Sequence, residues 1–409
     1  MNKLTTLTIN KFRNVAPTTL EFRPGINVVL GRNGTGKSAL LRLLSASMGA
    51  DDGLRDDVLE VRCRVSGAAL EVEHTLSSTR VEQPSVSMVS GELVSESLSV
   101  LQRSDSFSIE RKGETVLRAR VLPNDIFLES DSPQSRVDRV FPGDPIWSLG
   151  LALMMARPDP ASKELAQEIL STRIVGAYRL DEGIERLGRL LELEFELIRA
   201  GYRVKSPRGP EEFPQSFFKV LRGPVPEGTS ETSTLDFLDR VARILGYESA
   251  TARFDVERLG PAPGQQVVRL SNLRFFFKKP GEEVSHDLLG YGQKRLLSLF
   301  AYADASRDVI IADELVGGLH HEWIPACLQE LGERQAFLTS QNPLLLDALR
   351  FESVDDVRRA FVLCERANGG AGPQLIWRNP TEKEAGSFFA AYQKRIQRVS
   401  DLLLTEGFW

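Results

Sequence analysis

The residues best suited to chemistry form one short glycine-rich run, Gly31-Arg32-Asn33-Gly34-Thr35-Gly36-Lys37-Ser38, which fits the pattern G-x-x-x-x-G-K-[ST]. Glycines let a backbone curl so that several N–H groups point at one phosphate. A helix that follows presents its positive N-terminal end to the same oxygens. Lys37 can reach the β- and γ-phosphates, and the Ser38 hydroxyl can ligate Mg²⁺. The run predicts a site for ATP with Mg²⁺, with contacts from Arg32, Asn33, Gly34, Thr35, Gly36, Lys37, Ser38 and Ala39.

A pair of carboxylates, Asp313 and Glu314, follows the apolar run Val309-Ile310-Ile311-Ala312. Ligands of parallel α/β sheets bind at the carboxyl ends of strands. Asp313 is therefore predicted to hold Mg²⁺, directly or through water, and Glu314 to activate the attacking water as a general base. The alternative is an ordinary Asp-Glu pair at a solvated strand end.

The elements around both motifs have the expected patterns. Residues 26–30 form a short apolar run typical of a buried strand. A helical pattern starts at Ser38 and stops near Gly49. Residues 335–339 predict another buried strand, and residues 291–305 a helix.

In this order the motifs resemble the ABC-type ATPases, and within them the SMC/RecF-like branch and its relatives, the AAA-family ATPases of the OLD-like type. The opening run Lys11-Phe12-Arg13-Asn14, followed by Leu20-Glu21-Phe22, is similar to the first strands of that branch. Residues 1–50 and 285–345 carry the resemblance.

The resemblance implies a signature motif at Leu289-Gly290-Tyr291-Gly292-Gln293, with Gly290, Tyr291, Gly292 and Gln293 closing on the γ-phosphate held by a second subunit. That geometry implies a head-to-tail dimer or a higher homo-oligomer. The family usually has Ser where this chain has Gly290 and a small residue where it has Tyr291, so closure is expected to be weaker or differently built. The alternative is a turn that merely starts a helix.

Two further motifs complete the carry-over from the family. Gly317-Gly318-Leu319-His320-His321 occupies the position of the D-loop. Adjacent histidines point in different directions on a helix, so a shared metal site is not expected. Gln341 stands where many relatives have a His that senses the γ-phosphate. Because Gln cannot become charged, we expect either slow turnover or a site that acts as a switch. The alternative for residues 339–343 is a plain Asn-Pro turn that ends a strand.

The resemblance offers two further candidates. Gln134 is a candidate for the metal-contacting glutamine loop of the family. Arg13 is a candidate nucleotide contact, with a surface strand residue as the alternative.

The predicted fold class is α/β: a P-loop NTPase head of the ABC type with a mixed central sheet, an antiparallel β subdomain and a helical insert. We expect an N-terminal ATPase lobe at residues 1–146, a helical insert at 147–262 and a C-terminal ATPase lobe at 263–409. Within these parts, a serine-rich stretch at 85–99 predicts a loop or an irregular edge. Residues 184–198 predict one helical stripe. Pro380 with Thr381 and Glu384 predicts the start of a last helix, whose apolar face continues to Leu403.

Composition sets outer limits. A net charge of −5 gives no global basic field, which argues against a protein held on nucleic acid by charge alone. Cys63, Cys327 and Cys364 are far apart and predict buried thiols. No apolar run of membrane-spanning length appears, so a cytoplasmic location is expected.

Three functions remain open at this stage. One is an ATPase that assembles through ATP and regulates a partner effector or nuclease, as relatives in bacterial phage defence do. The second is a RecF-like repair ATPase that binds DNA, and the third a nucleotide-dependent scaffold that hydrolyses slowly. The chain after the last ATPase strand is too short for the Toprim nuclease domain of the OLD-like enzymes, so the effector is expected to be a separate protein.

Overall fold

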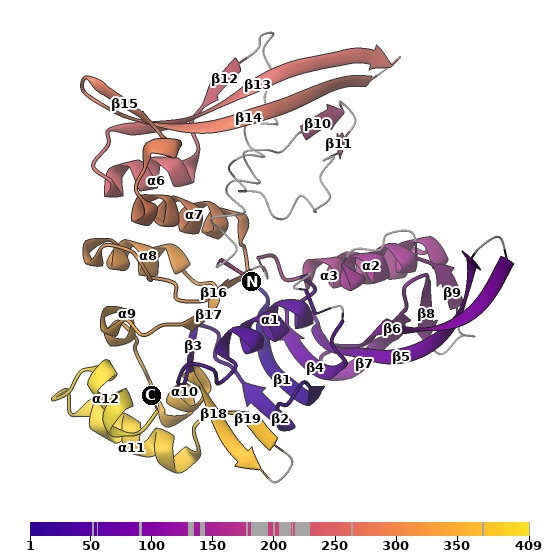
Figure 1. Cartoon of the computed structure of the whole chain (residues 1–409), viewed down its shortest axis with the longest axis horizontal. Coiled ribbons are helices and arrows are strands. Elements are labelled where there is room, and N and C mark those ends of the chain that lie inside the picture. Colours follow the sequence, from indigo (N-terminus) through magenta and orange to yellow (C-terminus); the bar gives the residue numbers. More distant parts are fainter. Residues whose placement is uncertain are drawn as a thin grey trace. The chain divides into compact units, whose positions relative to one another are not determined.

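The structure is a computed structural model, which describes the chain apart from residues 51–52, 55, 90–91, 130–134, 140–143, 177–178, 181–194, 199–200, 204–213, 215, 217–229, 263–264, 370–371 and 409. The elements are labelled in Figure 1. The chain forms two compact units. The first consists of Met1–Ala177 and Arg350–Trp409, and the second of Tyr178–Leu349.

An eight-stranded antiparallel sheet dominates the first unit, in the order β2-β1-β4-β5-β6-β7-β8-β9 (Figure 1). Side chains alternate between buried and exposed along strands such as β4, as expected when one face packs on a core. Two helices, α2 and α3, share a hydrophobic core with this sheet that includes Phe107, Leu149 and Ile169. The strands are β1 Lys3–Phe12, β2 Thr18–Glu21, β4 Leu59–Ser66, β5 Glu71–Val89, β6 Glu92–Arg111, β7 Glu114–Val121, β8 Asp125–Glu129 and β9 Ser135–Asp138, and the helices α2 Pro145–Ala156 and α3 Pro160–Ser171.

A second group of strands in the first unit supports the glycine-rich run. Strand β3 (Ile26–Leu30) pairs in parallel with β18 (Phe361–Gly369), which forms an antiparallel hairpin with β19 (Gly372–Arg378). Helix α1 (Lys37–Ser47) follows the run. The remaining helices are α10 Val354–Ala360, α11 Glu382–Gln393 and α12 Val399–Thr405.

The end of α1 is held by a buried histidine of β5. His74 Nδ1 lies 3.0 Å from the Ser47 carbonyl oxygen, and His74 Nε2 lies 2.8 Å from Asp105 Oδ1. Both ring nitrogens face acceptors, so both donate and the ring is an imidazolium. Burial alone lowers the pKa of His74, but hydrogen bonds to Asp105 and Cys63 outweigh it and raise the pKa to about 10. A cation at the C-terminal end of α1 also complements the helix dipole.

The second unit combines a parallel strand pair, a set of helices and a separate antiparallel sheet. Strands β16 (Val309–Ala312) and β17 (Gln335–Thr339) are parallel and fully buried. The antiparallel sheet has the order β11-β10-β14-β13-β12, with β15 paired to β14 (Figure 1). Its strands are β10 Phe195–Ile198, β11 Gly201–Arg203, β12 Ser230–Ser233, β13 Ser249–Ala262, β14 Gln265–Lys279 and β15 Glu282–Ser285. The helices are α6 Asp236–Ile244, α7 Tyr291–Ala305, α8 Ile324–Leu331 and α9 Pro343–Asp347, with short 3₁₀ turns η3 His286–Leu288 and η4 His321–Trp323.

The predicted mixed α/β class with a large antiparallel sheet is confirmed, while three local predictions are wrong. The described residues of the serine-rich stretch form neither a loop nor an irregular edge, because β5 and β6 pair without interruption as far as Val89 and Glu92. Backbone hydrogen bonds between strands do not require apolar side chains. The polar composition of this stretch was therefore a poor indicator of a loop. The helical stripe fails at Phe195 and Ile198, which lie in β10, while residues 184–194 of that stripe lie outside the described residues.

The third error concerns the last helix. It begins as predicted, with a capping box between Thr381 and Glu384. The apolar pattern predicts one helix as far as Leu403, but α11 ends at Gln393 and Ile396 is 83% exposed. Arg395 has a φ of 55°, a left-handed conformation that ends a helix. The three-part domain division stays a prediction. The range 147–262 expected to be a helical insert includes strands β10 to β13 as well as helices.

Candidate nucleotide site

The glycine-rich run forms a tight loop between β3 and α1. Gly31, Gly34 and Gly36 have φ angles of 145°, 79° and 86°, values that side chains disfavour. A Cβ added at Gly34 would have no neighbour within 4 Å, so this part of the loop faces open space. α1 has no acidic residue in its first turn. A curled backbone before an acid-free helix N-terminus suits an anion such as phosphate.

The cationic side chain of the loop lies back on the loop itself. Lys37 Nζ donates to the carbonyl oxygens of Gly31 at 2.7 Å and Arg32 at 3.2 Å. Thr35 Oγ1 also donates to the Arg32 carbonyl, at 2.7 Å. Arg32, Asn33, Gly34 and Ser38 are exposed, Thr35 is buried, and Gly36, Lys37 and Ala39 are half-buried. The predicted phosphate contacts therefore lie together, and a triphosphate fits their chemistry.

Arg13 is engaged with an acidic partner. Its guanidinium forms a bidentate ion pair with Asp57 at 2.8 and 2.9 Å, and it stacks over Phe12. The hydrogen bond to Asp57 is the main cause that raises the pKa of Arg13. The nucleotide contact predicted for Arg13 stays a prediction. Gln134 lies outside the described residues.

In the second unit, Thr339 at the end of β17 organises the acidic pair. Its buried hydroxyl donates to Asp313 Oδ1 at 2.5 Å and accepts the backbone N–H of Glu314 at 2.8 Å. Strands β16 and β17 run in parallel, so their carboxyl ends bring these groups together. Asp313 and Glu314 both remain half-buried. This places two carboxylates at one strand edge with a defined orientation.

The turn at Glu314 is strained and held from two sides. Glu314 has a φ of 51°, which a residue with a side chain adopts only at a cost. Arg295 of α7 donates to the Glu314 carbonyl oxygen at 2.5 Å. The backbone N–H of Gln341 lies 3.3 Å from Glu314 Oε2, and the Gln341 residue is exposed. The structure thus brings Asp313, Glu314 and Gln341 together.

The predicted signature residues form the start of α7. The Gln293 side chain accepts the Gly290 N–H at 2.8 Å and so caps the helix. Gly292 packs on the predicted D-loop, where an added Cβ would lie 2.8 Å from the Gly318 carbonyl oxygen. Tyr291 is 65% exposed, and its ring lies beside Gly318. The signature and D-loop segments therefore make one surface, joined to the acidic pair through Arg295.

The paired histidines lie next to each other at the surface. The His320 and His321 rings have centroids 4.4 Å apart and are tilted by 38° to each other, and both residues are exposed. No group of three or more His, Cys, Asp or Glu suited to a metal occurs in the described part of the chain.

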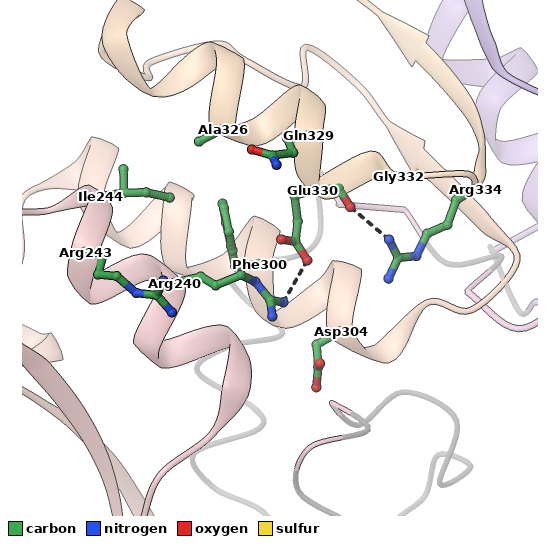
Figure 2. A pocket seen from close by; sticks show the side chains of 10 residues that line it. All are labelled: Arg240, Arg243, Ile244, Phe300, Asp304, Ala326, Gln329, Glu330, Gly332 and Arg334. Atoms are coloured by element: carbon green, nitrogen blue, oxygen red, sulfur yellow. Dashed lines mark hydrogen bonds and ion pairs between the residues drawn. The ribbon is translucent and has the colours of Figure 1, made fainter.

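A separate cleft of about 660 Å³ lies among α6, α7 and α8, and Figure 2 shows its side chains. Arg240 reaches across to Glu330, with 2.8 Å between Nη2 and Oε1. Arg334 donates to the carbonyl oxygens of Ala303, Ser306, Glu330 and Leu331. Asp304 accepts hydrogen bonds from Ser216. These groups join the helices to one another, so we assign the cleft no nucleotide.

The sequence revealed no role for three residues: Thr339 and Arg295 in the second unit, and Trp377 in the first. Trp377 Nε1 donates to the Thr35 carbonyl oxygen at 3.0 Å, across 342 positions of sequence. The sequence predicts the strand that Thr339 ends and the helix that contains Arg295. It does not predict which residues the two side chains contact. No local pattern around Trp377 marked it.

Comparison with known proteins gives limited but concordant matches. The model of a family described as an AAA domain, AAA_23, matches residues 6–88. The DNA replication and repair protein RecF of Psychromonas ingrahamii is 54% identical over 41 residues, which is 10% of this chain and 11% of RecF. The resemblance to ABC-type ATPases of the SMC/RecF branch is confirmed.

Two solved structures are similar at a distance. The SMC head domain from Thermotoga maritima has a TM-score of 0.36 and 12% identity, covering 91% of this chain and 98% of that one. An SMC head bound to the C-terminal winged-helix domain of ScpA has a TM-score of 0.39 and 11% identity, covering 92% and 98%. At these scores the solved structures carry no argument, and the description of this chain relies on its own motifs and contacts. Among its described residues, no helix is long and apolar enough to cross a membrane.

Proposed function

We propose that this chain binds ATP with Mg²⁺ at the loop of residues 31–38 and hydrolyses it. The observation that carries the proposal is the loop itself, whose three glycines have positive φ and whose backbone leads into the acid-free start of α1. Lys37 would exchange its hydrogen bonds to loop carbonyls for the β- and γ-phosphates. ATPases of the SMC/RecF branch, which this chain resembles, generally use ATP and Mg²⁺.

Oxygen donors fit the metal. Ser38 and Asp313 offer a hydroxyl and a carboxylate, the ligand types that Mg²⁺ prefers. Bound Mg²⁺ would neutralise charge that develops on the phosphates. Glu314 acts as the general base for the attacking water, and Thr339 and Arg295 hold its backbone for that role. Gln341 contacts the γ-phosphate as a neutral hydrogen-bond donor, which gives slow turnover.

For the cellular role we propose ATP-dependent assembly that regulates a separate effector protein, in phage defence. The exposed start of α7, with Gly290 and Tyr291, would meet the nucleotide of a second copy. Support comes from the signature and D-loop segments forming one surface. Purification with and without ATP, together with the products of neighbouring genes, identifies the effector. An effector that copurifies equally without ATP would contradict this role.

The match to RecF favours one alternative, an ATPase that binds DNA. Binding to duplex DNA in the presence of ATP would then weaken steeply as the salt concentration rises. A protein that binds DNA releases counterions condensed on the phosphates, and added salt opposes that release. Absence of binding at low salt with ATP removes this alternative.

Two variants test binding and hydrolysis separately. Lys37→Ala should abolish measurable ATP binding, whereas Lys163→Ala, at an exposed position of α3, should leave it unchanged. Glu314→Gln should bind ATP, stop phosphate release and trap an assembly that the wild type leaves. Exposed Glu248→Gln is the matched control. The scaffold alternative predicts a different result. The wild type would bind ATP without releasing phosphate, and Glu314→Gln would assemble no better than the wild type.

A further inference from the structure

The loop of residues 31–38 rests on the hairpin β18–β19, which comes from the far end of the chain. Strand β18 pairs with β3 as far as Leu363 and Leu30, so Cys364 lies next to Gly31. A Cβ added at Gly31 would come within 2.3 Å of the Cys364 carbonyl oxygen. Trp377 is the cross-strand partner of Cys364. The hairpin therefore forms the floor of the loop.

Trp377 packs directly beneath the loop. It is fully buried, with its ring centroid 6.1 Å from that of Phe12. A Cβ added at Gly36 would lie 3.0 Å from Trp377 Cζ2 and 2.8 Å from Leu375 Cδ1. The loop backbone thus sits directly on the indole and cannot move closer to it.

The indole also fixes the direction of one peptide group. Its N–H donates to the Thr35 carbonyl oxygen at 3.0 Å, and the two groups are buried. The Thr35 carbonyl and the Gly36 N–H belong to one planar trans peptide, so they point in opposite directions. Holding the carbonyl down on Trp377 turns the Gly36 N–H away from the floor. Gly36 is the N-cap of α1, in a left-handed conformation with φ 86° and ψ 17°.

We propose that Trp377 is a positioning residue for phosphate binding, which aims the Gly36 N–H at the β-phosphate of a nucleoside di- or triphosphate. The inference rests on the proposed function, since it specifies how the same loop is organised. In glycine-rich loops of this kind, backbone N–H groups bind the α- and β-phosphates. A tilt of one peptide plane would remove one of these donors without moving Lys37.

Two replacements of Trp377 separate its N–H group from its bulk. Trp377→Phe keeps an aromatic ring and removes the donor. A tryptophan analogue with sulfur in place of the indole N–H, inserted at position 377, keeps the whole shape. Each should weaken binding of ATP and of ADP by about tenfold, the factor that corresponds to 1.4 kcal/mol. Trp147→Phe, at a 42% exposed site on α2, should bind both nucleotides as the wild type does.

A spectroscopic readout distinguishes positioning from simple support of the fold. In protein with ¹⁵N-labelled indoles, the Trp377 N–H signal should shift when ADP is added, and the Trp147 signal should not. Wild-type affinity in both Trp377 replacements, or a Trp377 signal indifferent to ADP, would overturn the inference alone. A wild-type protein that binds no ATP would overturn the proposed function and the inference with it.

Discussion

The sharpest prediction concerns the hydroxyl of Thr339. Thr339→Val keeps the shape of the buried side chain and removes both of its hydrogen bonds, to the Asp313 carboxylate and to the Glu314 N–H. The Glu314 backbone, already at a φ of 51°, then loses the contact that fixes it to β17. Thr339→Ser retains the hydroxyl and is the matched control.

The magnitude follows from the two bonds. A hydrogen bond to a charged group contributes about 1.5–3 kcal/mol, and one to a neutral group about 0.5–1.5 kcal/mol. Asp313 and Glu314 are half-buried, so water replaces part of this, and a net loss of about 2 kcal/mol remains. If that loss falls on the transition state, kcat decreases by about 30-fold. If it falls on the fold, the melting temperature decreases by about 4–8 °C.

Steady-state phosphate release and thermal unfolding, measured on the same preparations, distinguish these outcomes. ATP affinity measured without Mg²⁺ should stay near that of the wild type, because the variant leaves residues 31–38 unchanged and perturbs only the proposed metal ligand Asp313 and the Glu314 backbone. Thr339→Ser should keep at least a third of the wild-type kcat. The reasoning is refuted if Thr339→Val matches the wild type in both kcat and melting temperature.

Two further predictions concern other buried contacts. The raised pKa of His74, about 10 when folded, gives stability that is complete below its unfolded value of 6.5 and is lost as the pH rises through 10. Denaturant unfolding at pH 6 and pH 10 should therefore show a decrease of a few kcal/mol in the wild type and a smaller one in His74→Gln; equal decreases would contradict the imidazolium. Arg295→Met keeps the side-chain stem but removes the donor to the Glu314 carbonyl, so kcat should fall by about tenfold with ATP affinity unchanged. Arg295→Lys should recover part of the loss, and an unchanged kcat in the Met variant would exclude a role for this contact.

The sequence by itself determined the features that lie within one continuous segment. The loop of residues 31–38 between a strand and a helix, and the acidic pair after β16, were predicted from spacing alone. So was the capping box of Thr381 and Glu384. Each depends on neighbours a few positions apart, whose geometry follows from the local backbone.

Tertiary structure decided which distant groups orient those segments. Thr339 joins the acidic pair because β16 and β17 are parallel, and Trp377 supports the loop because β18 pairs with β3. Strand pairing also decided the structure where the local pattern predicted otherwise. The described residues of the serine-rich stretch are strands, because β5 and β6 pair with each other. Hydrogen bonds between residues hundreds of positions apart leave no periodicity in a single sequence, so only the folded chain shows that Trp377 lies under Thr35 and Gly36.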